Sequence, residues 1–167
     1  MFKQVLLPIL AVIVFIIAVG IFVRKTSSLN LTGFGTPQPT ARPEKTITIG
    51  SKTIQVQIAD TTQEREQGLS GVSSLAQDKG MLFVFDTKVT AVFWMKDMLF
   101  PLDMIWIADG KIVAINKNIP KPAPNTPDNQ LKTYSPGQFI DRVLEVNAGF
   151  ADNNKIKVGD SVDLSHI

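Results

Sequence analysis

The stretch LDMIWIADGKIVAIN, residues 102–116, decides the fold class. Two apolar runs lie on either side of Asp109-Gly110, and an Asp-Gly pair between such runs is the strongest short signal for a β-hairpin. A type I′ turn needs positive φ at both central residues, which aspartate and glycine tolerate well. The stretch therefore predicts two antiparallel strands joined by a tight turn.

Alternation of apolar and polar residues continues on both sides of this hairpin. Residues 46–60, TITIGSKTIQVQIAD, predict a second hairpin that turns at Gly50-Ser51. Residues 80–85, 91–96 and 139–147 predict further strands, and a last strand pair is expected about Gly159-Asp160. We expect an all-β domain with minor helix, an antiparallel β-sandwich or jelly-roll-like barrel. No strand-helix-strand rhythm is long enough to predict a parallel sheet.

Two short helical pieces interrupt the strands. Thr61 followed three residues later by Glu64 forms a capping box, and Gly68 is placed to end a helix of about two turns. Asn147 is expected to cap a second, shorter helical turn through residues 148–154.

The amino-terminal part of the chain has a different composition. Val5 to Val23 is an uncharged apolar run that would span roughly 28 Å as a helix, close to the thickness of a bilayer core. Arg24 and Lys25 follow, where a cleavable signal peptide would carry small residues. Residues 1–25 are therefore predicted to be a transmembrane signal-anchor, residues 26–46 a flexible linker rich in Ser, Thr, Gly and Pro, and residues 47–167 the folded domain. We expect a single-pass protein of the cell membrane with the domain outside the cytoplasm.

Composition excludes several functions. Acidic residues slightly outnumber basic ones between Ile47 and Ile167, so a nucleic-acid partner is not expected. The chain has no cysteine and a single histidine, His166, which lies at the frayed carboxy terminus. A catalytic triad, a transition-metal site and a bound cofactor are therefore not expected.

The stretch FWMKDMLFPLDMIWI, residues 93–107, suggests a ligand site. Pro101 cannot donate a ladder hydrogen bond, so residues 97–101 are predicted to form a corner between two strands. Lys96 and Asp103 could approach across that corner, either as an ion pair that fixes the turn or as the polar floor of a site with Trp94 as its apolar wall.

A second set of polar residues lies on the strand at residues 139–147. Glu145 and Asn147 share one strand face with Asp141 and Val143, while Leu144 and Val146 share the other. Glu145 with Asp103 from another strand would give the two carboxyl groups that a glycoside-type hydrolase needs. A half-exposed strand face without a task is the simpler interpretation.

The segment 117–137 carries five prolines and is predicted to be a stiff loop. It contains Tyr134, which we add to the candidate ligand-binding residues. The full candidate set is Trp94, Lys96, Asp103, Tyr134, Glu145 and Asn147.

Several blocks of the chain together resemble the domain of unknown function 192 family. These blocks are IADTTQEREQGLSG, GMLFVF, FWMKDMLFPLDMIWI, DGKIV and VLEVNAGFADNNKIKVGDSV, in that order. The resemblance implies a β-sandwich of jelly-roll type and no established activity. The chain departs from the family pattern at Asp97, where asparagine is common.

The sequence is compatible with three functions, and it does not decide whether the protein is an enzyme. The first is a binding or interaction module for a glycan or another envelope protein. The second is a carboxylate-dependent hydrolase. The third is a structural subunit of an envelope complex.

Overall fold

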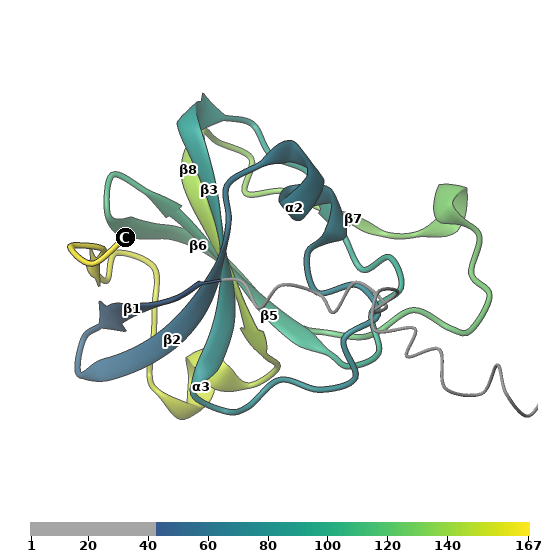
Figure 1. Cartoon of the computed structure of the whole chain (residues 1–167), viewed down its shortest axis with the longest axis horizontal. Helices are drawn as coiled ribbons and strands as arrows, with labels where there is room; N and C mark the ends of the chain where they lie inside the picture. Colours follow the sequence, from purple (N-terminus) through teal and green to yellow (C-terminus); the bar gives the residue numbers. More distant parts are fainter. Residues whose placement is uncertain (1–42) are drawn as a thin grey trace, which may run out of the picture. The chain divides into compact units, whose positions relative to one another are not determined.

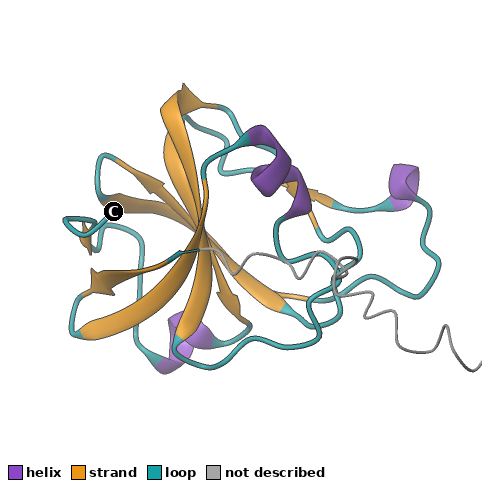
Figure 2. Cartoon of the chain, viewed as in Figure 1, coloured by secondary structure: helices purple, strands orange, loops and turns teal. Residues whose placement is uncertain are grey.

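The computed structural model describes residues 43–167. Within them the chain forms strands and three short helical segments (Figures 1 and 2). The strands are β1 (Glu44–Ile49), β2 (Lys52–Ala59), β3 (Lys79–Val89), β4 (Phe93–Trp94), β5 (Leu102–Ala108), β6 (Lys111–Ile119), β7 (Thr133–Tyr134), β8 (Ile140–Asn147) and β9 (Val162–Asp163). The helical segments are α2 (Thr62–Gln67), the 3-10 turn η2 (Asp128–Gln130) and α3 (Phe150–Asn153).

One sheet of seven strands forms the body of the domain, in the order β6-β5-β8-β3-β2-β1-β9. It curls into a half-barrel, and the prediction of an all-β domain with minor helix is confirmed (Figure 2). The two ends of the sheet meet at one corner, where Lys111 bridges Ser161 and the Val162 N–H donates to the Gly110 carbonyl at 2.8 Å. A two-stranded ribbon, β4-β7, lies outside this sheet.

The turns of the two predicted hairpins have the positive φ angles that their sequences predict. Asp109 and Gly110 have φ of 51° and 68°, and the hairpin β5-β6 pairs Ala108 with Lys111 across them. Gly50, at φ 60°, begins the turn of the β1-β2 hairpin. Both predicted hairpins are confirmed.

The sheet contains one parallel pair, which the sequence did not predict. β2 and β3 run parallel, with Val56 opposite Gly80, and residues 60–78 with α2 cross between them. A parallel connection needs only a dozen or more residues, so this short helix and its flanking loops suffice. The other pairs in the sheet are antiparallel.

Two strand predictions and one helix cap are corrected. Of the strand expected at 91–96, only the two residues of β4 are a strand. Of the strand pair expected about Gly159-Asp160, only β9 forms. The helix α3 begins after Gly149, with no side-chain cap, and Asn147 does not cap it. The Asn147 side chain instead donates to the carbonyls of Leu75 and Ala76, at 2.9 and 3.1 Å.

The sheet separates two hydrophobic cores, because successive side chains on a strand point to opposite faces. On β5, Met104 and Trp106 pack in one core, and Ile105 and Ile107 in the other. The Trp106 indole N–H donates to Asn116 Oδ1 at 2.7 Å, so its burial leaves no unpaired donor. The first core is covered by the segment around α2 and β4, and the second includes Phe150 and Ala151 of α3.

No helix among residues 43–167 is long and apolar enough to cross a membrane. The predicted anchor at residues 5–23, and almost all of the linker predicted at 26–46, lie outside the described residues.

Candidate functional site

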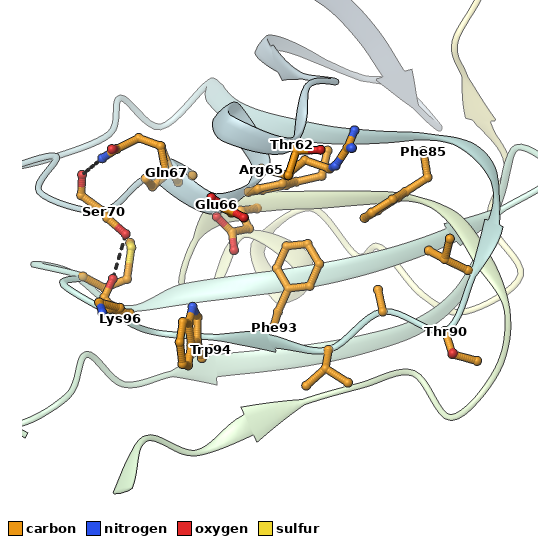
Figure 3. A pocket seen from close by; sticks show the side chains of 18 residues that line it. Thr62, Arg65, Glu66, Gln67, Ser70, Phe85, Thr90, Phe93, Trp94 and Lys96 are labelled. Atoms are coloured by element: carbon orange, nitrogen blue, oxygen red, sulfur yellow. Dashed lines mark hydrogen bonds between the residues drawn. The ribbon is translucent and has the colours of Figure 1, made fainter. Parts of the chain in front are cut away.

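A pocket opens between α2 and the segment that carries β4, above the face of the sheet that holds Met104 and Trp106 (Figure 3). Its volume is about 470 Å³, which is within the range of ~300–1,000 Å³ typical of small-molecule sites. Three regions of the chain build it: residues 62–70, the end of β3 with the segment to Met98, and one residue of β8.

The walls of the pocket are mostly apolar. Phe93 projects into its centre (Figure 3) and meets Phe83 edge to face, with ring centroids 4.8 Å apart. Met98 and Leu69 are buried beside them, and Trp94 stands at the mouth with 46% of its surface exposed. Val92, also at the mouth, is 64% exposed, so apolar surface continues from the interior to the rim.

Glu145 is the residue of β8 that reaches the pocket. Its strand neighbours are Met81 on β3 and Met104 on β5, and only 4% of its surface is exposed. Within residues 43–167 its carboxyl group has no hydrogen-bond or ion-pair partner, and burial raises its pKa to about 8. At pH 7 the group is therefore mainly a neutral carboxylic acid, able to donate one hydrogen bond.

The two cations that line the pocket are bonded elsewhere. Arg65 donates to the carbonyls of Asp60 and Val84 and lies 5.3 Å from the centre of the Phe85 ring. Lys96 is paired with Asp128 and lies 5.5 Å from the centre of the Trp94 ring. The hydrogen bond to Asp128 raises the pKa of Lys96, which stays charged at neutral pH.

Three of the predicted site residues meet at this pocket: Trp94, Lys96 and Glu145. Tyr134 lies next to them, because β7 pairs it with Phe93. Lys132 covers the Tyr134 ring at 5.1 Å, and burial raises the pKa of its phenol. The proline-rich loop is thus tied to the pocket by β7 and by the Lys96–Asp128 pair.

Asp103 does not line the pocket. It pairs with Val146, next to Glu145, and so points to the opposite face of the sheet. Its buried carboxylate accepts hydrogen bonds from the N–H groups of Asn118, Gly149 and Ala151, at 2.7, 3.1 and 2.9 Å. The expected approach of Lys96 to Asp103 does not occur, and the carboxyl pair of Asp103 with Glu145 is not formed.

Asn147 also serves the fold, since its amide holds the loop before β3. The sequence interpretation missed the contribution of Arg65, Glu66, Phe83 and Phe93. α2 was predicted, but only the parallel crossover brings it over β8, and the local pattern did not reveal that crossover. Among residues 43–167, no cluster of His, Cys, Asp and Glu side chains is suited to a metal ion.

Comparison with known proteins agrees with the fold. The model of the DUF192 family, described as "Uncharacterized ACR", matches residues 45–164, and the chain belongs to this family. The crystal structure of a candidate transcription regulator from Sinorhizobium meliloti is 29% identical, covers 73% of this chain and 94% of its own, and gives a TM-score of 0.65. No curated protein matches the chain significantly.

A second solved structure shows the fold alone. It is a protein of unknown function from Novosphingobium aromaticivorans, 24% identical, with 75% of this chain and 89% of its own covered and a TM-score of 0.68.

Proposed function

We propose that this member of the DUF192 family is a binding module for a small organic ligand, because it carries a preformed apolar pocket whose wall holds a buried acid, Glu145, without a partner among residues 43–167. The single observation that carries the proposal is the buried Glu145 carboxyl group. A buried polar group without a partner costs free energy, and binding sites are where such a cost is retained. A ligand that hydrogen-bonds to Glu145 and fills the pocket would recover it.

The hydrolase alternative is weaker. A carboxyl group with a raised pKa suits a general acid, and Glu145 has that property. The alternative also needs a second carboxyl group about 5–9.5 Å away. Asp103, the partner that the sequence suggested, lies on the other face of the sheet and is hydrogen-bonded there, and Glu66, the other acid that lines the pocket, is exposed. We therefore favour binding over bond cleavage.

Partners suggested by the sequence remain proposals. A glycan or another envelope protein would meet the domain at the exposed Trp94 and Val92. The proposal keeps the sequence-based expectation that residues 5–23 hold the module at the membrane and that the domain lies outside the cytoplasm. A regulator of transcription, as the S. meliloti protein is described, is not favoured, because acidic residues slightly outnumber basic ones between residues 47 and 167, whereas DNA-binding domains carry an excess of basic residues.

A pocket-filling variant tests the binding function. Ala91 lines the pocket and is 7% exposed, so Ala91→Leu places extra side-chain atoms in the cavity. Benzyl alcohol is a suitable probe, titrated by calorimetry into the full chain in detergent. We expect wild type to bind it and Ala91→Leu to bind at least tenfold more weakly. Phe139→Ala, at an exposed position outside the pocket, is the matched control and should bind as wild type does.

Equal binding by wild type and Ala91→Leu would contradict the assignment of the pocket. A pull-down from solubilised membranes with wild type and Trp94→Ala tests the alternative occupants. A protein or glycan lost only from Trp94→Ala would show that the mouth of the pocket binds a macromolecule.

A further inference from the structure

The charged side chains that line the pocket differ in whether they have hydrogen-bond or ion-pair partners within the protein. Arg65 and Lys96, the cations that line it, are each bonded to oxygen atoms of the protein. Glu66 on α2 and Glu145 on β8 are the acids that line it, and neither side chain has a bonded partner within residues 43–167. The pocket therefore offers acidic groups without counter-charges and no free cation of its own.

The burial of Glu145 separates it from an ordinary surface acid. Glu66 is exposed at the rim, whereas Glu145 is 96% buried and still lines the cavity. An ionised carboxylate at such a position needs a counter-ion close by, because its own hydration is lost. The bonds of Arg65 and Lys96 leave that counter-ion to be supplied from outside.

The aromatic rings of the site suit a cation as well. The Trp94 and Phe85 rings already hold Lys96 and Arg65 at 5.5 and 5.3 Å. Phe93 lies in the centre of the pocket (Figure 3). Its ring makes edge-to-face contacts with Phe83 and Trp106. Aromatic rings attract organic ammonium groups through their electron-rich faces, as they attract these two side-chain cations.

From this geometry we propose that the ligand is a small organic amine with an apolar body, whose ammonium group pairs with the Glu145 carboxylate while its body lies against Phe93 and Met98. The inference rests on the binding function proposed above and specifies its ligand class.

The protonation state of Glu145 determines whether ligand binding releases a proton. Glu145 is mainly protonated at pH 7, so an ammonium ion that binds to its carboxylate displaces the carboxyl proton to solvent. Other charged groups facing this site come from α2, as Arg65 and Glu66, and from the segment after β4, as Lys96. The residues paired with Glu145 on β3 and β5 are methionines, which do not titrate. Binding of an amine is thus coupled to the release of about one proton below pH 8.

Two probes with the same benzyl group, one an amine and one a neutral alcohol, test whether the pocket prefers an ammonium group. Benzylamine and benzyl alcohol differ only in the head group, and both are titrated by calorimetry into the full chain in detergent at pH 6, 7 and 8. We expect the dissociation constant of benzylamine to fall about tenfold per pH unit from pH 6 to 7, as the carboxylate fraction rises. That of benzyl alcohol should stay level or rise slightly.

Variants and buffers identify the group responsible. Glu145→Gln keeps the size of the side chain, and we expect it to bind benzylamine no tighter than benzyl alcohol at any pH. Asp78→Asn, an exposed acid outside the pocket, should keep the wild-type preference. If Glu145→Gln does not fold, the enthalpy of benzylamine binding to wild type is compared in phosphate and in Tris at the same pH. Release of one proton makes the two enthalpies differ by the difference between the ionisation enthalpies of the buffers, and equal enthalpies would overturn the inference.

The outcomes distinguish the two proposals. If benzyl alcohol binds and benzylamine gains nothing between pH 6 and 8, the amine inference is overturned and the binding function stands. If neither probe binds wild type, both are overturned. A preference for benzylamine that survives in Glu145→Gln would also overturn the inference, since Glu145 would not be the counter-charge.

Discussion

Glu145 and Asp103 are both buried acids on adjacent strands, and they differ in what surrounds the carboxyl group. Asp103 accepts hydrogen bonds from three backbone N–H groups, whereas Glu145 lies between Met81 and Met104 and lines the mostly apolar pocket. A fully bonded carboxylate stabilises the fold, and an unbonded one is available to a ligand.

The raised pKa of Glu145 predicts how stability depends on pH. The unfolded chain loses this proton near pH 4.5, and the folded protein holds it to about pH 8. Between these values only the folded state binds the proton, so the free energy of unfolding falls as pH rises, by up to about 1.4 kcal/mol per pH unit. Glu145→Gln should remove this slope and be the more stable protein at pH 8. Urea denaturation at pH 5, 6.5 and 8 measures both.

Asp78→Asn is the control for that slope, because its side chain is exposed. A Glu145→Gln variant with an undiminished slope would show that other groups titrate in this range.

Asp103→Ala is expected to destabilise the domain by about 3 kcal/mol, because three backbone N–H groups, that of the buried Ala151 among them, lose their acceptor. Chemical denaturation at pH 7 measures the loss. Asp86→Asn, at an exposed position, should change stability by less than about 0.5 kcal/mol. A loss of under 1 kcal/mol in Asp103→Ala would mean that water replaces the carboxylate.

At the scale of elements, α2 connects the fold to the site. Its capping box is complete, with Thr61 Oγ1 accepting from the Glu64 N–H at 3.2 Å and Glu64 Oε2 accepting from the Thr61 N–H at 3.1 Å. The same helix then presents Arg65 and Glu66 to the pocket (Figure 3). A short helix depends on its cap, because few of its own hydrogen bonds hold it.

Thr61→Ala should therefore lower the free energy of unfolding by about 1 kcal/mol. Denaturation with urea measures this, and Gln63→Ala, on the exposed side of the same helix, should be near neutral. Benzyl alcohol binding should weaken in Thr61→Ala but not in Gln63→Ala. Identical stability of the two variants would show that the box adds nothing in this context.

At the scale of the whole molecule, the curled sheet gives each buried strand two different environments. One face packs against α3 and holds Asp103, and the other carries the pocket and Glu145. The short ribbon β4-β7 and the Lys96–Asp128 pair connect the proline-rich loop to the pocket side.

The full chain is expected to fractionate with membranes, because residues 5–23 form an uncharged apolar run of bilayer length. Carbonate washing of membranes followed by blotting measures this, and a variant lacking residues 1–25 should move to the soluble fraction. Protease added to intact cells should digest the domain if it lies outside the cytoplasm. Full-length protein recovered in the soluble fraction would contradict the anchor.

Local sequence was sufficient for much of the fold. Turn residues such as Asp109-Gly110, and the cap at Thr61, act through their immediate neighbours, so their effects could be predicted. The parallel pairing of β2 with β3 could not, because it depends on where the crossover of residues 60–78 packs, and no local pattern predicts that. For the same reason, Arg65 and Glu66 were missed as pocket residues, whereas Trp94, Lys96 and Glu145, three of the candidates, line the pocket.

The sequence by itself determined the strand faces, the hairpins and the short capped helix, since period-2 alternation and turn chemistry are properties of neighbouring residues. It placed Asp103 and Glu145 in strands but treated them as possible partners. Only the tertiary structure decided that they face opposite sides of the sheet. Asp103 is bonded there by N–H groups from distant segments, and Glu145 has no partner in the described part of the chain. The physical reason is that burial and hydrogen bonding of a side chain depend on segments far away in the chain.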